Sequence, residues 1–167
     1  FDASQTLGDS GERFPSGAHW MLVEGSGAEP VTLAQDPELD LDDPKVLEAA
    51  VAVAFSHFPS ERRALVLWDH GGAWSGGFGG DSQNGTRKQT APLYAPEVAS
   101  AIAAGLARAG VDARGGEKPL DLFSFDACLM AGVEVAWEFR DLTRAYIGNA
   151  ELDYGDGWDY AAFLSHL

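Results

Sequence analysis

The sequence predicts an α/β fold, a three-layer α/β/α sandwich around a mainly parallel sheet. Short apolar runs typical of strands alternate with longer runs whose apolar residues recur at helical spacing, as in sheets with crossover helices. Two of the apolar runs are continuous, which is expected for strands buried on both faces. With 167 residues and 46% hydrophobic content, the chain can bury one core. We expect residues 1–167 to form a single domain.

The first elements are an irregular segment and a hairpin. Residues 1–18 are polar and contain Gly and Ser, so we expect a loop. The run HWMLVEG, residues 19–25, is apolar and closed by glycine, which predicts a strand. The following GSGAEPV is typical of a turn, and it leads into a second strand at VTLAQ, residues 31–35.

A helix and a buried strand are expected next. Asp43 is a suitable N-cap residue, Pro44 suits the first helical position, and Pro59 ends the helical pattern. The apolar face of this helix consists of Val46, Leu47, Ala50, Val51, Ala54 and Phe55. The run RALVLWDHGG, residues 63–72, is continuous and closed by glycines, so we expect a buried parallel strand.

The alternation resumes after a long loop. Residues 71–93 are rich in glycine and show little periodicity, which predicts a mobile loop of the length that often carries function. A good helical pattern then runs to Gly110. The remaining expected elements are a strand at 120–128, a helix at 129–142, a strand at 144–152, and a loop with a short helix at 154–167.

The charge of the chain restricts its partners. Its 26 acidic and 11 basic residues give a net charge of −15, so nucleic acid, which needs a basic surface, is not an expected partner. A basic peptide or divalent cations suit this field, and solubility alone is the alternative explanation. No run approaches the ~18 apolar residues of a membrane span. No signal peptide is visible and no methionine begins the chain, so we expect a processed or truncated piece.

The single cysteine, Cys128, follows directly on a buried strand. An ordinary thiol has a pKa of about 8.5, so a nucleophilic cysteine needs a nearby imidazole or helix N-terminus. His70 ends another expected strand, and the helix expected from residue 129 begins directly after the cysteine. Neighbouring parallel strands end at the same edge of a sheet. We therefore expect His70 as base and Cys128 as nucleophile to lie together.

Glycines beside His70 support the same interpretation. The backbone N–H groups of Gly71 and Cys128 are candidates for an oxyanion hole. Asp69 is expected to point to the opposite side of its strand and to be structural. As an alternative, a lone buried cysteine is most often a small hydrophobic residue. The other histidines lack a comparable setting and are expected to be structural or on the surface: His19, His57 and His166.

Three segments, ALVLWDHGGAW, FSFDACLMAGVEVAWEFRD and YIGNAELDYGDGWDY, resemble the clostripain-like cysteine peptidases, of the wider clan of caspases, legumains and gingipains. The resemblance extends from about Pro44 to Tyr160. It implies a caspase-like fold, a catalytic dyad of His70 and Cys128, and cleavage of peptides or proteins after Arg or Lys. Such a dyad requires no cofactor.

The resemblance also implies an acidic S1 pocket, which receives the side chain before the scissile bond. Asp126, two residues before the cysteine, corresponds to the pocket acid, and a carboxylate pairs well with guanidinium. Asp156 is a second candidate, with a turn role as its alternative. Some relatives use calcium, and the acidic residues 36–43 are a candidate for weak binding. They do not match an EF-hand, so a solvated loop is the alternative.

Activation by cleavage between the histidine and the cysteine is a further implication. The basic pair Arg87 and Lys88 lies in the loop at 71–93 and is the candidate processing site, with an ordinary exposed charge pair as the alternative. The family's first strand and its C-terminal region have no counterpart in the sequence, so a second chain is a candidate to complete the fold. The family favours a secreted or periplasmic location, with the cytoplasm as the alternative.

The sequence therefore predicts a cysteine endopeptidase with basic P1 specificity. The alternative is a catalytically inactive caspase-like scaffold that binds a basic partner through its acidic surface. A phosphate-binding domain is not expected, because the glycine-rich loop lacks the GK[ST] ending and the net charge disfavours an anionic ligand.

Overall fold

The computed structural model of the chain contains two compact units. One comprises Phe1–Leu41, Asp81–Thr90 and Trp158–Leu167; the other, which we call the sheet unit, comprises Asp42–Gly80 and Ala91–Gly157. The residues that the structure describes are 18–22, 31–36, 39–80, 92–111, 117–153 and 157–164.

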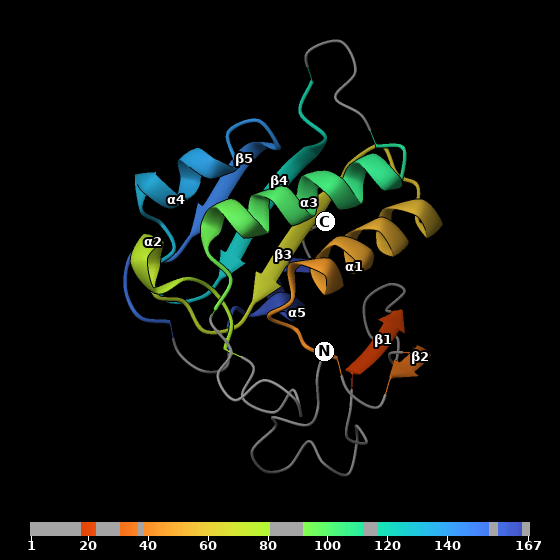
Figure 1. Cartoon of the computed structure of the whole chain (residues 1–167), viewed down its shortest axis with the longest axis horizontal. Helices are drawn as coiled ribbons and strands as arrows, with labels where there is room; N and C mark the ends of the chain where they lie inside the picture. Colours follow the sequence, from red (N-terminus) through yellow and green to blue (C-terminus); the bar gives the residue numbers. More distant parts are fainter. Residues whose placement is uncertain are drawn as a thin grey trace. The chain divides into compact units, whose positions relative to one another are not determined.

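The sheet unit is built around three parallel strands in the order β3-β4-β5 (Figure 1). β3 covers Ala64–Trp68, β4 covers Leu120–Asp126 and β5 covers Thr143–Gly148. β4 is the central strand, and its last four residues are buried. The α/β fold with a parallel sheet is confirmed.

The first long helix, α1, covers Pro44–His57 and begins where the sequence predicts. The Lys45 N–H donates to Asp43 Oδ1 at 2.8 Å, so Asp43 caps the first turn. Proline at the first helical position lacks only an N–H that would have no partner within the helix.

The second long helix, α3, covers Ala95–Arg108, and its first turn is closed by the backbone N–H of Tyr94, which donates to Glu97 Oε2 at 2.9 Å. α3 packs on α1 at Gly105. A Cβ atom there would lie 2.6 Å from the carbonyl oxygen of Glu48, so only glycine permits this approach of the two helices.

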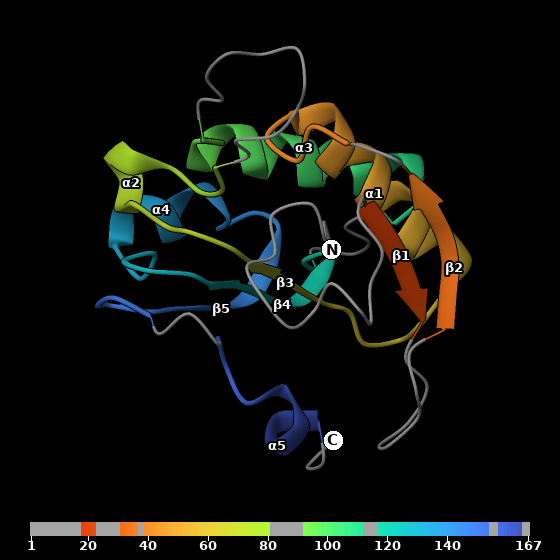
Figure 2. The ribbon, with the colours of Figure 1, turned by 90° about the horizontal axis from the view of Figure 1, so that it is seen from below.

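Two short helices belong to the same unit. α2 covers Ala73–Gly76 and α4 covers Val133–Glu138. Figure 2 shows α1, α2, α3 and α4 on one side of the sheet. α4 contacts both α2 and α3, in agreement with a single helical layer on that face.

Aromatic rings fill the space between the sheet and this helical layer. Phe123 and Phe125 of β4 share the face toward the helices, and both are fully buried. Phe123 stacks on Phe139 with ring centroids 4.3 Å apart, and Phe78 lies 4.9 Å from Phe125. The alternation of a strand places Ser124 and Asp126 on the opposite face of β4.

The other unit contains a hairpin and a short helix. β1, Ala18–Leu22, pairs antiparallel with β2, Val31–Asp36, as the sequence predicts, with an irregularity between Trp20 and Met21. His19 of β1 is buried. The helix α5 covers Tyr160–Leu164.

One expectation about the sheet unit is wrong in detail. The expected helix at 129–142 is only α4, because residues 128–131 form a turn in which Leu129 has φ +61°. The described part of residues 71–93 contains α2 and isolated bridges from Phe78 to Gly71 and Leu93. Among the described residues, no helix is long and apolar enough to cross a membrane.

Candidate active site

The pairing of β3 with β4 brings the two strand ends together. Each residue of β3 pairs with the β4 residue 58 positions later, ending with Trp68 opposite Asp126. His70 and Cys128 lie two residues beyond this last pair and have the same separation in sequence. Both therefore leave the same edge of the sheet from neighbouring strands, as the sequence predicts.

The backbone after β3 is fixed in a small antiparallel bridge. The carbonyl of His70 accepts from the N–H of Gly79 at 3.0 Å, and the N–H of Gly72 donates to the carbonyl of Gly77 at 2.8 Å. The N–H of His70 donates to Asp69 Oδ1 at 2.6 Å. The His70 side chain is exposed, and within the described residues its imidazole makes no hydrogen bond, so it is accessible for proton transfer.

The turn after β4 is held by the segment that follows β5. The N–H of Leu129 donates to the carbonyl of Glu151 and the N–H of Ala131 donates to the carbonyl of Asn149, both at 3.0 Å. The hydroxyl of Tyr146 donates to the carbonyl of Met130, and burial raises the pKa of this phenol above its ordinary value of 10. These contacts fix the backbone on the C-terminal side of Cys128.

The thiol of Cys128 is half-buried and contacts Asp153. The backbone N–H of Asp153 donates to Sγ at 3.1 Å, and Sγ lies 3.7 Å from the Asp153 carbonyl oxygen. The side chain of Asn149 donates to Asp153 Oδ2 at 2.6 Å. Sequence reasoning gave neither Asn149 nor Asp153 a role, although both stand in the quoted run YIGNAELD.

The position of α4 corrects one expectation about the thiol. The sequence predicts a helix that begins directly after Cys128, and its N-terminus would favour the thiolate. The structure has Gly132 at the N-cap and starts α4 at Val133, after the turn. The hydrogen bond to the sulfur therefore comes from the Asp153 N–H and not from an N–H group at the start of α4.

Gly71 lies directly against the cysteine backbone. A Cβ atom on Gly71 would overlap the carbonyl oxygen of Cys128 and lie 2.9 Å from Cγ of Met130. Among the described residues, the backbone N–H groups of Gly71 and Cys128 donate no hydrogen bond. Two N–H groups beside the candidate nucleophile, Cys128, are thus available to an oxyanion.

The other predicted site residues are only partly described. Asp126 is 1% exposed, on the face of β4 away from the aromatic core. Gly157 lies over it, since a Cβ atom there would be 2.7 Å from Asp126 Oδ2 and 2.5 Å from Nε1 of Trp68. Asp156, Arg87, Lys88 and His166 lie outside the described residues.

Two acidic side chains of the candidate calcium segment have structural roles. Asp42 Oδ1 accepts from the N–H of Gly80 at 3.1 Å, and Asp43 caps α1. In the described part of the chain no group of three His, Cys, Asp or Glu side chains could hold a metal ion. His57, on the surface, lies with Nδ1 3.0 Å from the carbonyl oxygen of Val53 in its own helix.

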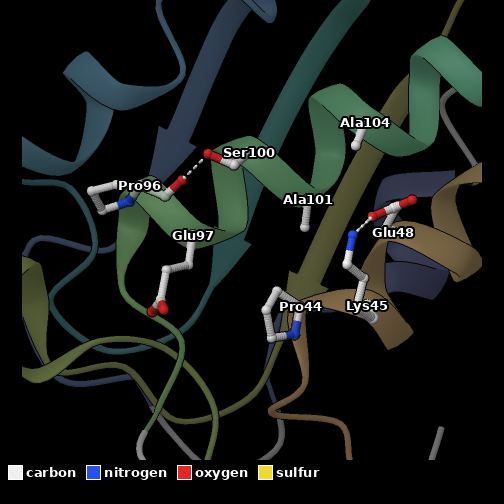
Figure 3. A pocket seen from close by; sticks show the side chains of 8 residues that line it. All are labelled: Pro44, Lys45, Glu48, Pro96, Glu97, Ser100, Ala101 and Ala104. Atoms are coloured by element: carbon white, nitrogen blue, oxygen red, sulfur yellow. Dashed lines mark hydrogen bonds and ion pairs between the residues drawn. The ribbon is translucent and has the colours of Figure 1, made fainter.

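A groove elsewhere on the sheet unit lies between α1 and α3 (Figure 3). Ion pairing of Lys45 with Glu48 at 2.7 Å crosses its α1 wall, and Ser100 donates to the carbonyl of Pro96 at 2.7 Å in its α3 wall. Neither His70 nor Cys128 lines this groove, so it is separate from the candidate dyad.

Comparisons with known proteins agree with this geometry. Residues 15–167 match the model of the clostripain family, peptidase C11. Among curated proteins there is no match. The structure resembles a secreted C11 cysteine protease from Bacteroides thetaiotaomicron in complex with an irreversible peptide inhibitor, with a TM-score of 0.68 and 23% identity over 87% of this chain and 38% of that one.

A second structure described as a secreted C11 cysteine protease from Bacteroides thetaiotaomicron gives a TM-score of 0.62 and 20% identity over 84% of this chain and 40% of that one. An inactive zymogen C11 protease from Parabacteroides distasonis gives a TM-score of 0.58 and 22% identity. The match covers 84% of this chain and 36% of that one. The sequence thus spans 36–40% of the length of these chains. At these identities the likeness demonstrates a shared fold.

Proposed function

The chain belongs to the clostripain family, and we propose that it is a cysteine endopeptidase that cleaves after arginine or lysine through a dyad of His70 and Cys128. One observation carries the proposal. β3 and β4 pair in parallel up to Trp68 and Asp126, and His70 and Cys128 each follow two residues after this last pair. The family match and the fold of the C11 protease structures support the same class of enzyme.

The proposed reaction follows acyl-transfer chemistry. His70 removes the proton of the Cys128 thiol, and the thiolate sulfur attacks the carbonyl carbon of the scissile bond. The oxyanion that forms accepts hydrogen bonds from the N–H groups of Gly71 and Cys128. His70 then donates its proton to the leaving amine, and the C–N bond breaks. Water, deprotonated by His70, attacks the carbonyl carbon of the acyl-enzyme, the C–S bond breaks to release the carboxylic acid, and His70 returns the proton to the sulfur. No cofactor enters the reaction.

Charge supports a basic residue before the scissile bond. A guanidinium or ammonium group pairs well with a carboxylate in a buried site, and Asp126 supplies one at the end of β4. Because Gly157 lies over this carboxylate, a substrate side chain that pairs with Asp126 displaces the backbone at residue 157. Asp156, the neighbouring residue in sequence, remains the second candidate for the pocket.

We also propose that the enzyme is stored as a zymogen and activated by cleavage at Arg87–Lys88, within residues 71–93. An enzyme that cleaves after arginine or lysine could cleave this bond in its own chain. The fold of an inactive zymogen C11 protease supports a latent form in the family. Residues 1–167 form one peptidase domain in this proposal, and chain outside them, or a second chain, completes it. Export from the cytoplasm is proposed because the C11 proteases from Bacteroides thetaiotaomicron are secreted.

Calcium is not part of the proposed reaction. Weak binding of calcium by residues 36–43 stays a prediction, and isothermal titration of the chain with calcium chloride would test it. The hydrogen bonds that occupy Asp42 and Asp43 argue for a structural role of this segment.

The decisive test is hydrolysis of fluorogenic peptides that differ only at P1, with Arg, Lys, Asp, Asn or Leu. The chain nicked at Arg87–Lys88 and the uncut chain are assayed beside their Cys128→Ala variants. We expect cleavage of the Arg and Lys peptides alone, and none by Cys128→Ala. Equal cleavage by Cys128→Ala would overturn the dyad. Silence of the nicked chain toward every peptide would favour the scaffold that binds a basic partner.

A further inference from the structure

Residues beyond β5 control the environment of the Cys128 sulfur. The Asp153 N–H donates to Sγ at 3.1 Å, and α4 begins too late in the chain to supply its own N-terminal N–H groups. A hydrogen bond to the charged form of a group favours that form. The thiolate therefore depends on where the Asp153 backbone is held.

Asn149 contacts the segment that contains this backbone. Its Nδ2 donates to Asp153 Oδ2 at 2.6 Å and to the carbonyl of Ala127 at 3.4 Å, the second a long contact. Its own carbonyl accepts from the N–H of Ala131 at 3.0 Å. Asn149 thus connects the segment after β5, which contains the Asp153 N–H, to residues on both sides of Cys128 in the turn after β4.

The carboxylate of Asp153 makes this link important, because negative charge near sulfur disfavours a thiolate. The Asn149 amide binds the carboxylate of Asp153, which is the acid whose own backbone contacts the sulfur.

We propose that Asn149 is a positioning residue for the nucleophile, which acts through Asp153 to favour the Cys128 thiolate. The inference rests on the proposed function for its biological meaning. Its physical content is a property of the thiol and can be measured without any peptide substrate.

The test is the rate of alkylation of the full chain by iodoacetamide as a function of pH. Cys128 is the single cysteine, so the reaction reports on one sulfur. In Asn149→Ala we expect the midpoint of the pH–rate profile to rise by about one pH unit, the size expected for one hydrogen bond to a charged group. At pH 7 the rate should fall roughly five- to tenfold, since only the thiolate reacts.

Two further variants separate positioning from general loosening. Asp153→Asn keeps an acceptor for the Asn149 amide and removes a negative charge, so its midpoint should not rise. Ser124→Ala removes a different side-chain hydrogen bond of the sheet unit, from Ser124 Oγ of β4 to the carbonyl of Ile147 of β5 at 3.2 Å. Its profile should match the parent chain. If Asn149→Ala does not fold, as judged by circular dichroism, Asn149→Ser replaces it.

A profile of the Asn149 variant that superimposes on that of the parent chain overturns the proposal. A rise of equal size in Ser124→Ala overturns it as well, because the effect would then be a general loosening. The peptide assay is independent of this result. An upward shift in a chain that cleaves no peptide would uphold the positioning role and reject the peptidase, while peptide cleavage with an unshifted midpoint would do the reverse.

Discussion

Gly71 packs so closely on Cys128 that a single Cβ atom added to it would overlap the cysteine carbonyl oxygen. The two residues come from segments that follow different strands, and their contact joins the base side of the candidate dyad to the nucleophile side. This close approach requires a residue without a side chain. Gly71 is therefore fixed by packing as well as by its proposed role in binding the oxyanion.

Replacing Gly71 by Ala should abolish most of the proposed peptidase activity. The added methyl group must push the Cys128 backbone away, and a misplacement of about 1 Å in a catalytic group costs on the order of 10²-fold in rate. The measurement is kcat/KM on the P1-Arg peptide, with thermal unfolding followed by circular dichroism. Gly76→Ala is the matched control, since nothing lies within 4 Å of a Cβ atom there. Full activity in Gly71→Ala would contradict the site geometry.

The His70 imidazole should control the reactivity of the thiol toward a substrate-like reagent. We expect an arginyl chloromethyl ketone to label Cys128 in the chain nicked at Arg87–Lys88, and His70→Ala to slow the labelling at least about tenfold, because general-base assistance contributes 10²–10⁴-fold. Mass spectrometry of the labelled chain gives the rate. His57→Ala serves as control, because that imidazole contacts its own helix on the surface. Equal labelling of the two variants would argue for an ordinary cysteine.

The aromatic core should dominate the stability of the sheet unit. Phe123 is fully buried and stacks on Phe139, so Phe123→Ala should lower the free energy of unfolding by about 3–5 kcal/mol. Phe58, which is 49% exposed, provides the comparison, and Phe58→Ala should cost well under half as much. Urea unfolding monitored by tryptophan fluorescence measures both. Similar losses for the two variants would contradict the position of the core.

Stability should depend on pH through the carboxylate of Glu48. Hydrogen bonds from Lys45 and Arg108 hold the pKa of Glu48 below its usual value of 4.5. A lowered pKa in the folded state stabilises the fold above the unfolded value, and this contribution disappears as the pH falls through the folded value. Glu48→Gln should therefore be less stable than the parent chain at pH 7, with the difference closing below about pH 4.

Urea unfolding at pH 7 and at pH 3 measures this difference. Glu61→Gln, at an exposed position after α1, should differ less from the parent chain in its free energy of unfolding at pH 7. If Glu48→Gln loses more unfolding free energy at pH 3 than at pH 7, the pH dependence is opposite to that of a stabilising carboxylate, and the prediction is wrong.

Local chemistry was sufficient to predict the long elements and the edge of the sheet that carries the site. Asp43 and Pro44 predict the start of α1, and the continuous apolar runs predict β3 and β4. The start of α4 could not be predicted in this way. Leu129 adopts a positive φ while its N–H bonds to Glu151, a residue distant in sequence, and helical spacing in residues 129–142 contains no sign of that contact.

The same limit applies to the contacts of the thiol. The histidine and cysteine can be predicted because their side chains have distinctive chemistry at the ends of strands. Asp153 contacts the sulfur through its backbone N–H, and Asn149 acts through its side-chain amide, which binds Asp153. Such groups occur in any sequence pattern, so the sequence alone does not identify these contacts. Asp126 was predicted as a pocket acid, but its cover by Gly157 depends on how the backbone after β5 folds over β4.

The ladder between β3 and β4 also determines which changes of length the chain can tolerate. Residues inserted between Gly80 and Leu93, or between Val111 and Leu120, leave every pair of the ladder intact, so related sequences can differ widely in the separation of histidine and cysteine. One residue added between Trp68 and His70, or between Asp126 and Cys128, would turn the following side chain to the opposite face. The short spacers between each strand end and the following His70 or Cys128, and not the total separation, are therefore the feature by which distant homologues with this site can be sought.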